Sequence, residues 1–361
     1  LILENSQISW TRDSYCSDCC SNMINLKTKI TQIHYTRDPQ GVLFEILKFC
    51  SYFYGAGSRI KNFLYDKGIL KPKRVAAYVI SVGNMTTGGV GKTPVVAEIA
   101  KYLVAKGERV AIVSRGYGGK LNNKNVNMIS DGQSIFFDAV QAGDEPYMLS
   151  EMTPGCYVFT CRDRYLAAKY AVEKFGIEKI ILDDGFQHRK LHRDLDIVLM
   201  DSVKGFGNEC LLPAGPLREG SEALDRIDKL LIVSKNRNHE IAEKVSRIMH
   251  KRLTLPTSVC YTEPDYVYNI KTGQRLMEGL AVTAMCAIGQ PQQFYDFLSD
   301  YEVVKTVTFD DHHQYAPIDI VDISGSIITT EKDAVKLARF DRDNIYALKL
   351  KTTVNVEELL K

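Results

Sequence analysis

The sequence of 361 residues lacks several features that mark common functional classes. Its formal net charge is only +2, too small for bulk electrostatic binding of nucleic acid, and it has no arginine–aromatic platform. The apolar, aromatic run Val42–Tyr54 is shorter than the ~20 residues needed to span a bilayer. Residues Leu1–Glu4 have neither the basic start nor the apolar segment of a signal peptide. We therefore expect neither a nucleic-acid-binding nor a membrane-spanning protein, and no pattern indicates a protein partner.

A disulfide framework is also missing. The nine cysteines are an odd number at irregular spacing, which indicates reduced thiols in a cytosolic setting. Cys16, Cys19 and Cys20 include a C-x-x-C, but no second ligand pair follows at zinc spacing, so metal or redox use is the weaker interpretation there. Residues 1–40 carry little fold signal, and disorder is one expectation for this leader.

Apolar segments alternate with helical ones from residue 75 onward, and 45% hydrophobic content is ample for packed cores. The expected strands are Val75–Val82, Glu108–Ser114, Cys156–Cys161, Lys179–Leu182, Leu195–Asp201 and Asp228–Ser234. This alternation predicts an α/β fold with a mostly parallel sheet, helices on both faces and ligands at the carboxyl ends of the strands. We place the main domain at 75–253 and a smaller C-terminal α/β domain at 254–361, joined by a β-ribbon at Ser258–Tyr268.

A glycine-rich turn between the first strand and a helix is the strongest motif. Such a turn lets backbone N–H groups converge on a phosphate at a helix N-terminus. Lys92 would reach the β/γ-phosphates, and the Thr93 hydroxyl would hold Mg²⁺. The usual pattern G-x-x-x-x-G-K-[ST] has glycine where this chain has Thr86, so an ordinary βα turn with a surface lysine is the alternative. The candidate nucleotide-binding residues are Thr86, Thr87, Gly88, Gly89, Val90, Gly91, Lys92 and Thr93.

Asp183 and Asp184 follow the apolar strand at 179–182. A P-loop fold places its second Mg²⁺ anchor at such a strand end, although two aspartates there are also common as a turn or helix cap. With the glycine-rich turn upstream, metal binding is the favoured interpretation. His188 and His192 follow at the i, i+4 spacing of metal ligands, but the charged residues around them favour a polar loop over a zinc site.

Two more segments carry candidate acid–base groups. Asp144 and Glu145 begin a helical run, where acidic residues commonly act as caps and dipole partners. Phosphoryl transfer, however, needs a group that orients and deprotonates the attacking hydroxyl, and a carboxylate facing the phosphates would serve. His312 and His313 follow two aspartates, a pattern that suits either metal binding or acid–base work.

The segment 41–74 is an amphipathic, basic helical candidate. Its apolar run at 42–54 is followed by a cluster of cations with only Asp66 opposing. Such a segment suits the interface of an anionic membrane, and a helix packed on the sheet with a solvated basic edge is the alternative. The cations are Arg59, Lys61, Lys67, Lys71, Lys73 and Arg74.

Taken together, the motifs resemble the tetraacyldisaccharide 4′-kinase family of lipid A biosynthesis, in the same order and over roughly residues 42 to 350. The motifs are Thr87–Pro94, Ser114–Gly118, Gly143–Pro146, Asp163–Arg164, Leu182–His188, Leu212–Glu219, Ala287–Pro291, Asp311–His313 and Thr329–Asp333. The family itself lacks the first glycine of the phosphate motif, so Thr86 is no departure. It commonly has asparagine where this chain has Gln290, which leaves any contact made there in question.

The resemblance implies a P-loop kinase that transfers the γ-phosphate of ATP, with Mg²⁺, to the 4′-hydroxyl of tetraacyldisaccharide 1-phosphate. It also implies peripheral contact with the membrane at the cytoplasmic face of the inner membrane. A P-loop GTPase or metallochaperone is the alternative, for which Ser234–Arg237 is a poor match to the expected N-K-x-D motif. The residue roles implied by the family are catalytic base for Asp144, its assistant for His312, phosphate or substrate contacts for Arg164 and Arg218, and Mg²⁺ contacts for Asp183 and Asp184. Thr93, from the P-loop motif, and Glu145 are further candidate Mg²⁺ ligands, and Lys92 is counted with the catalytic residues.

Overall fold

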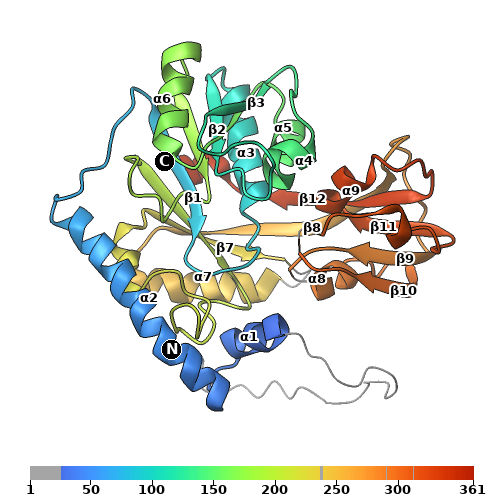
Figure 1. Cartoon of the computed structure of the whole chain (residues 1–361), viewed down its shortest axis with the longest axis horizontal. Coiled ribbons are helices and arrows are strands. Elements are labelled where there is room, and N and C mark those ends of the chain that lie inside the picture. The colour runs from blue at the N-terminus through green and yellow to red at the C-terminus, as the bar shows by residue number, and fades with distance from the viewer. Residues whose placement is uncertain (1–25, 236–238, 290, 312) are drawn as a thin grey trace.

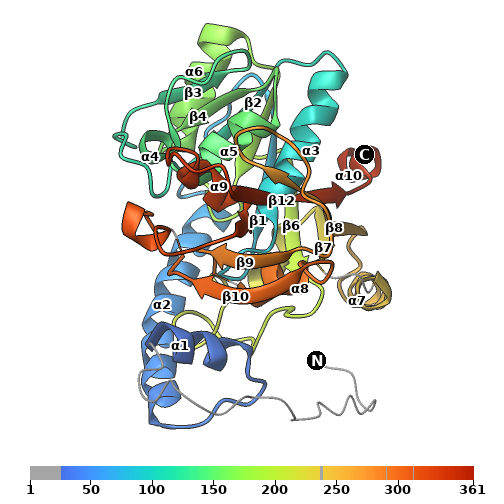
Figure 2. The ribbon, with the colours of Figure 1, turned by 90° about the vertical axis from the view of Figure 1, so that its right-hand side faces the viewer.

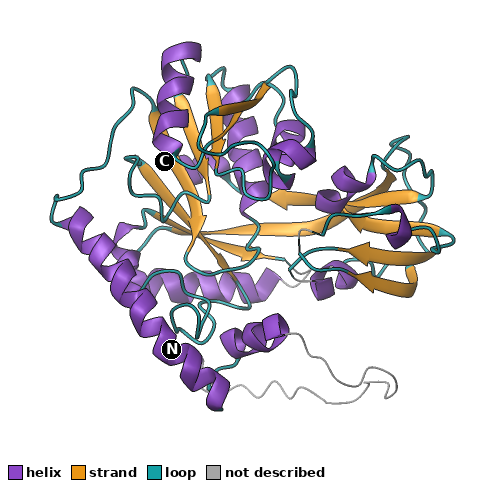
Figure 3. Cartoon of the chain, viewed as in Figure 1, coloured by secondary structure: helices purple, strands orange, loops and turns teal. Residues whose placement is uncertain are grey.

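The structure, a computed structural model, describes residues 26–235, 239–289, 291–311 and 313–361. Helices, strands and loops over these ranges are distinguished in Figure 3. The strands are β1 (Tyr78–Asn84), β2 (Val110–Ser114), β3 (Asn127–Asp131), β4 (Tyr157–Thr160), β5 (Lys179–Asp183), β6 (Leu195–Asp201), β7 (Lys229–Ser234), β8 (Thr257–Asn269), β9 (Ala281–Cys286), β10 (Glu302–Thr308), β11 (Ser326–Thr330) and β12 (Ile345–Thr353). The helices are α1 (Leu26–Tyr35), α2 (Val42–Asp66), α3 (Lys92–Ala105), α4 (Ala139–Ala142), α5 (Asp144–Met152), α6 (Arg164–Phe175), α7 (His239–Leu253), α8 (Pro291–Asp296), α9 (Glu331–Leu337) and α10 (Val356–Leu360), with the 3-10 helices η1 (Ser221–Arg226) and η2 (Pro317–Asp319).

The strands of the described residues form one sheet in the order β10-β9-β11-β12-β8-β7-β6-β1-β5-β2-β4-β3. From β8 to β4 all neighbours are parallel, with β3 antiparallel at the edge, and we call these strands the P-loop half. Strands β12, β11, β9 and β10 are also parallel to one another and form the C-terminal half. The long strand β8 joins the halves, since it pairs in parallel with β7 and antiparallel with β12. The direction of the strands therefore reverses at the pair β8 and β12, which lies between the halves (Figure 1).

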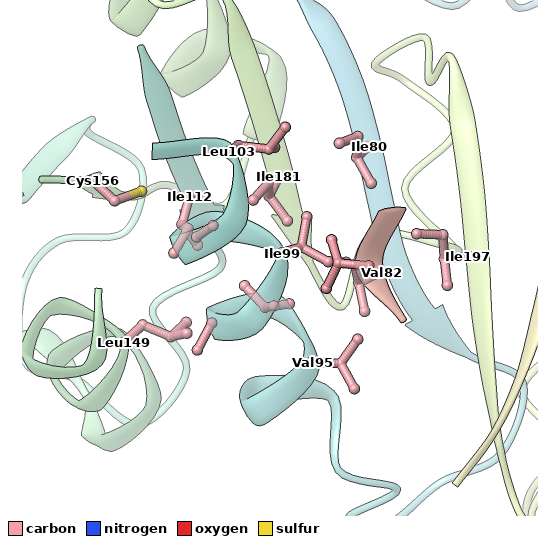
Figure 4. Packing of buried hydrophobic residues seen from close by; sticks show 14 of the residues in the cluster. Ile80, Val82, Val95, Ile99, Leu103, Ile112, Leu149, Cys156, Ile181 and Ile197 are labelled. Carbon is pink, nitrogen blue, oxygen red and sulfur yellow. The ribbon is translucent and has the colours of Figure 1, made fainter. Parts of the chain in front are cut away.

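The alternation of side chains along the strands builds a core on each face of the P-loop half. Ile80 and Val82 of β1 pack against α3, whose buried residues include Val95 and Ile99 (Figure 4). Val79, the residue before Ile80, packs on the opposite face, which α6 and α7 cover. Each such buried side chain contributes roughly 1.5–3 kcal/mol of transfer free energy. Helices thus cover both faces of a mostly parallel sheet, which confirms the predicted fold class.

The C-terminal half is covered in the same way by shorter helices. Phe294 of α8 packs with Val282 of β9 on one face. Leu337 of α9 packs with Met285 of β9 and Ile327 of β11 on the other. The sheet passes through the boundary expected near residue 253, because β7 and β8 on either side of it are paired neighbours.

Helices α1 and α2 lie outside the sheet, side by side at the edge of the molecule (Figures 1 and 2). Residues 26–35 of the expected leader are helical rather than disordered, because α1 packs on the loop around Asn208. The Asn208 backbone N–H donates to the His34 carbonyl at 2.8 Å, and the His34 ring Nε2 lies 2.9 Å from the Pro213 carbonyl. The C-x-x-C of the leader lies outside the described residues. Among those described, no helix combines the length and the apolar character needed to cross a membrane.

Candidate active site

A cleft of about 1070 Å³ lies where the two halves of the sheet meet. The carboxyl ends of strands from both halves reach it, for example Asp183 of β5 and Thr330 of β11. Ligands are expected at this position in open α/β sheets. The cleft brings together a large share of the predicted site residues, namely Gly88, Gly89, Val90, Gly91, Lys92, Thr93, Glu145, Arg164, Asp183, Asp184 and Arg218.

The P-loop, residues 86–93, leads from β1 into α3 and leaves the start of that helix uncapped. Gly91 is the N-cap residue, with a φ of +96° that favours glycine, and it offers no side-chain acceptor. The first N–H groups of α3 are therefore available to an anion, and the helix dipole favours negative charge there. The Lys92 Nζ lies 3.0 Å from Asn84 Oδ1 and 3.4 Å from Asp184 Oδ1, inside the same cleft.

The two aspartates at the end of β5 have different electrostatic surroundings. Asp183 is 3% exposed, and burial followed by the negative charge of Glu145 raises its pKa to about 7, although Lys92 opposes this. Burial also raises the pKa of Asp184, but Lys92 and Arg218 together outweigh that effect and hold it below its ordinary value. The charge of Asp184 is therefore balanced by two cations, whereas Asp183 is buried beside other negative charges. A divalent cation would relieve that crowding.

Within the described ranges, no group of three or more His, Cys, Asp or Glu side chains could hold a metal ion by itself. Magnesium does not require such a group, because it is usually bound by one or two carboxylates together with phosphate oxygens and water. Residues 185–194 form turns instead of a helix, so His188 and His192 do not share a helical face. The His192 Nε2 lies 3.3 Å from Asp194 Oδ1. The predicted polar loop is therefore what the structure contains.

Two arginines bring positive charge to the acidic pair. Arg218 Nη1 donates to both carboxylate oxygens of Asp184 at 2.9 Å, and its backbone N–H donates to the Met85 carbonyl at 2.8 Å. Arg164, the first residue of α6, is buried, and its Nη1 donates to the Arg162 carbonyl at 3.2 Å. Its Nε has no hydrogen-bond partner among the described residues. Arg164 therefore keeps donor capacity for an anion in the cleft.

Asp144 lies at the boundary between the two halves of the sheet. It is the first residue of α5, after Gly143, and its side chain is 7% exposed. Its Oδ2 is 2.9 Å from the Nζ of Lys336 on α9, so the carboxylate contacts the C-terminal half. Asp144 itself is not in the cleft lining, whereas Glu145 and Met148 of the same helix are.

His312, the expected assistant of the base, and Gln290, the departure from the family pattern, lie outside the described residues. The neighbouring His313 Nε2 lies 2.9 Å from Asp319 Oδ2. Thr86 and Thr87 are not in the cleft lining. Thr86 forms a β-bridge with Leu217, and the backbone N–H of Thr87 donates to a carbonyl of the same neighbouring segment, at residue 216.

Sequence reasoning missed Lys235, which follows β7 and whose Nζ donates to the Gly89 carbonyl of the P-loop. Burial lowers the pKa of Lys235 to about 8, although Asp201 opposes this. A cation directly after a buried strand was the available signal, because strand ends are where ligands bind in this fold class. In the sequence, Lys235 stands out only within Ser234–Arg237, the poor match to a base-specificity motif.

Comparison with known proteins shows that the chain is similar to one family over most of its length. The family described as tetraacyldisaccharide-1-P 4′-kinase matches residues 43–361. A tetraacyldisaccharide 4′-kinase of Desulfotalea psychrophila is 40% identical over 331 residues, covering 88% of this chain and 94% of the relative. One of Halothermothrix orenii is 38% identical, covering 88% of this chain and 92% of the relative. Both likenesses span the P-loop half and the C-terminal half.

A solved structure of LpxK from Aquifex aeolicus in complex with ATP is similar over most of the fold. It superposes with a TM-score of 0.70 at 33% sequence identity. The likeness covers 88% of this chain and 97% of that chain. An ATP-binding relative therefore shares the arrangement of both halves.

Proposed function

Because the chain belongs to the tetraacyldisaccharide-1-phosphate 4′-kinase family, we propose that it transfers the γ-phosphate of ATP to the 4′-hydroxyl of tetraacyldisaccharide 1-phosphate in lipid A biosynthesis. One observation carries the proposal. The uncapped start of α3 with Lys92 and the acidic pair Asp183–Asp184 face the same cleft, beside the helix that begins at Asp144. A GTPase or metallochaperone function is not favoured, because the family match covers the C-terminal half as well.

The chain's own residues supply positioning and charge neutralisation for this transfer. In-line phosphoryl transfer asks for little covalent help, so most of the acceleration comes from such groups. In our proposal the N–H groups of residues 88–93 and the ammonium of Lys92 hold the triphosphate. Arg164 and Arg218 contact phosphate or substrate, which their places in the cleft lining support.

Magnesium fits the residues present. Burial, and after it the negative charges of Glu145 and Asp184, raises the pKa of the Asp183 carboxyl. We propose that Asp183, Asp184, Glu145 and the Thr93 hydroxyl hold Mg²⁺ together with the nucleotide. When bound, Mg²⁺ would neutralise charge on the phosphate oxygens.

Asp144 is the proposed base that accepts the proton of the sugar hydroxyl, with His312 as its assistant. A base matters because sugar hydroxyls are weak acids. The position of Asp144 at the start of α5, one residue before a cleft-lining carboxylate, supports this role. Its contact with α9 makes the base depend on the C-terminal half as well.

We also propose that α2 rests on the membrane, at the cytoplasmic face of the inner membrane. Apolar side chains at helical spacing along α2 are each more than half exposed: Val42, Ile46, Phe49, Phe53, Ile60 and Phe63. Exposed cations follow at Lys67, Lys71, Lys73 and Arg74. An apolar stripe beside basic residues binds anionic interfaces through buried area and charge attraction.

Vesicle co-sedimentation tests this contact. Phe49→Asp with Phe53→Asp should abolish binding to vesicles that contain an anionic phospholipid, because two charges would enter the apolar stripe. Ile318→Asp with Val321→Asp, two exposed apolar residues of the C-terminal half, is the matched control and should bind as the wild type does. Equal binding by both double variants would contradict the proposal.

A radiolabelled transfer assay tests the enzyme activity. Wild-type protein with [γ-³²P]ATP, Mg²⁺ and tetraacyldisaccharide 1-phosphate in detergent should yield labelled lipid. Lys92→Ala should lower the rate by about 10²-fold or more, because one preorganised charge facing the transferred group is lost. Lys106→Ala, at the other end of α3, should leave the rate unchanged. A wild-type protein that labels no lipid would overturn the proposed function.

A further inference from the structure

Lys336 in the last turn of α9 is an almost fully buried charge. Its side chain is 1% exposed, and it lies in the C-terminal half of the sheet. Burying an ammonium group away from water costs several kcal/mol unless it is paired and hydrogen-bonded. The partners of Lys336 therefore indicate what this residue is for.

The ammonium lies closest to a carboxylate on the other half of the molecule. Its Nζ is 2.9 Å from Asp144 Oδ2 on α5, whereas Asp333, one turn earlier on its own helix, is 3.8 Å away. It also donates to the backbone carbonyl of His313 at 3.2 Å. One lysine thus connects the start of α5 with the loop that begins at His313.

A purely local role for Lys336 explains these contacts poorly. Asp333 has other partners within the C-terminal half, because its Oδ2 accepts from the Ala287 backbone N–H and the Thr330 hydroxyl, at 2.8 and 2.9 Å. Its Oδ1 has no hydrogen-bond partner among the described residues, and Lys336 is too far away to supply one. A lysine that served only its own helix would lie at hydrogen-bonding distance from Asp333. Instead the shortest contact crosses between α5 and α9.

We propose that Lys336 is a positioning residue that holds the carboxylate of Asp144 in its catalytic orientation and ties it to the loop that begins at His313. This inference rests on the proposed function, in which Asp144 is the base. A salt bridge from a buried ammonium to one carboxylate oxygen restricts the rotation of the carboxylate. The base is then correctly placed only when the C-terminal half is docked against α5.

Steady-state kinetics of Lys336→Met test the inference, since methionine keeps the length of the side chain and removes its charge. We expect kcat to fall by about 10²-fold, the effect of a misplaced catalytic group, while the KM for ATP changes by less than about twofold. Lys271→Met is the matched control, because Lys271 also pairs with aspartates of the C-terminal half, at 2.8 and 3.0 Å, but on the surface. It should keep the wild-type kcat.

A second variant keeps the test decisive if the loss of a buried cation unfolds the protein. The double variant Lys336→Met with Asp333→Asn removes the positive charge of Lys336 and the negative charge of Asp333 together. Asp333 is then not left as a buried charge on α9 without its cation. The double variant should fold and show the same loss of kcat. A kcat close to the wild-type value in either folded variant would overturn the inference. If wild-type protein itself transfers no phosphate, the proposed function fails instead, so the two failures are distinguishable.

Discussion

Two strand-to-helix corners with the same topology face the cleft, and they treat their helix starts in opposite ways. At the β1–α3 corner the N-cap is Gly91, with φ of +96° and no side-chain cap. At the β11–α9 corner the N-cap is Thr330, whose hydroxyl accepts from the Asp333 backbone N–H at 3.1 Å. At the β11–α9 corner a side chain of the protein accepts from an N–H group at the helix start. At the β1–α3 corner no side chain does, so the N–H groups are available to a ligand.

The lysines of these two helices differ in how far solvent or a ligand can reach them. Lys92 begins α3 with a side chain that is 15% exposed and belongs to the cleft lining. Lys336, in the last turn of the short helix α9, has a side chain that is 1% exposed and contacts Asp144. A helix start without a cap and a reachable cation mark a ligand site, while a capped start and a buried cation mark an internal joint.

The largest expected effect concerns α5, which like α3 begins after an uncapped glycine, Gly143. Asp144→Ala should lower kcat by about 10²–10⁴-fold and change the KM for ATP far less, because general base catalysis acts on the chemical step. Steady-state assays over a range of ATP concentrations give both constants. Glu151→Gln, further along the same helix, is the control and should keep both. Equal damage to kcat and KM would mean that Asp144 is a structural cap, as at the β11–α9 corner.

Gly91→Ala tests whether the uncapped corner is built for nucleotide. A Cβ there would meet nothing closer than 3.5 Å, so strain at positive φ, roughly 1–2 kcal/mol, is the main cost. We expect the KM for ATP to rise by about tenfold, since the first N–H groups of α3 would be redirected. Gly107→Ala at the other end of α3 has φ of +82° and open space, so it carries similar strain. If both variants changed the KM for ATP equally, the effect would be one of stability alone.

Thr330→Val tests the capped corner. Removing the hydroxyl deletes the cap of α9 and one donor to Asp333, which should lower the free energy of unfolding by about 1 kcal/mol. The KM for ATP should stay at the wild-type value. Urea unfolding followed by circular dichroism measures the first quantity, and Thr330→Ser, which keeps the hydroxyl, should retain the wild-type stability. A raised KM for ATP with unchanged stability would mean that this corner binds nucleotide too.

The sequence predicted the P-loop corner because its information is local. Glycines, Lys92 and Thr93 are contiguous between a strand and a helix, and the acidic pair directly follows an apolar strand. The alternation of apolar strands with helices likewise predicted the parallel sheet, and the strands of the P-loop half that were expected begin and end within three residues of the expected bounds. These features depend on neighbours along the chain, which pattern reading detects.

The joint between the halves was not predictable from the same patterns. Nothing in the sequence of β8 shows that it pairs with β7 on one edge and with β12 on the other. The contact between Lys336 and Asp144 depends on that pairing, since it joins helices from separate halves. Helix α1 was missed for a related reason, because its order comes from contacts with the loop around Asn208.

The smallest expected effect is a change in how the free energy of unfolding depends on pH, and it concerns a histidine of the P-loop half. Burial, followed by the charge of Arg164, lowers the pKa of His188 from 6.5 to about 4. The unfolded chain therefore binds a proton there at a higher pH than the folded one, so the free energy of unfolding falls as the pH drops from 6.5 toward 4. His188→Gln in the P-loop half should flatten this fall by roughly a few tenths of a kcal/mol per pH unit, below the limit of about 1.4 for one proton.

Thr330→Val provides the contrast, because it lowers stability at the capped corner without adding or removing an ionisable group. Its unfolding free energy should be shifted by the same amount at every pH across this window, parallel to the wild-type curve. Urea titrations at several pH values give the slopes. If the curve for His188→Gln is also parallel to that of the wild type, His188 binds protons equally in the folded and unfolded states. The loss of stability in acid then arises from residues other than His188.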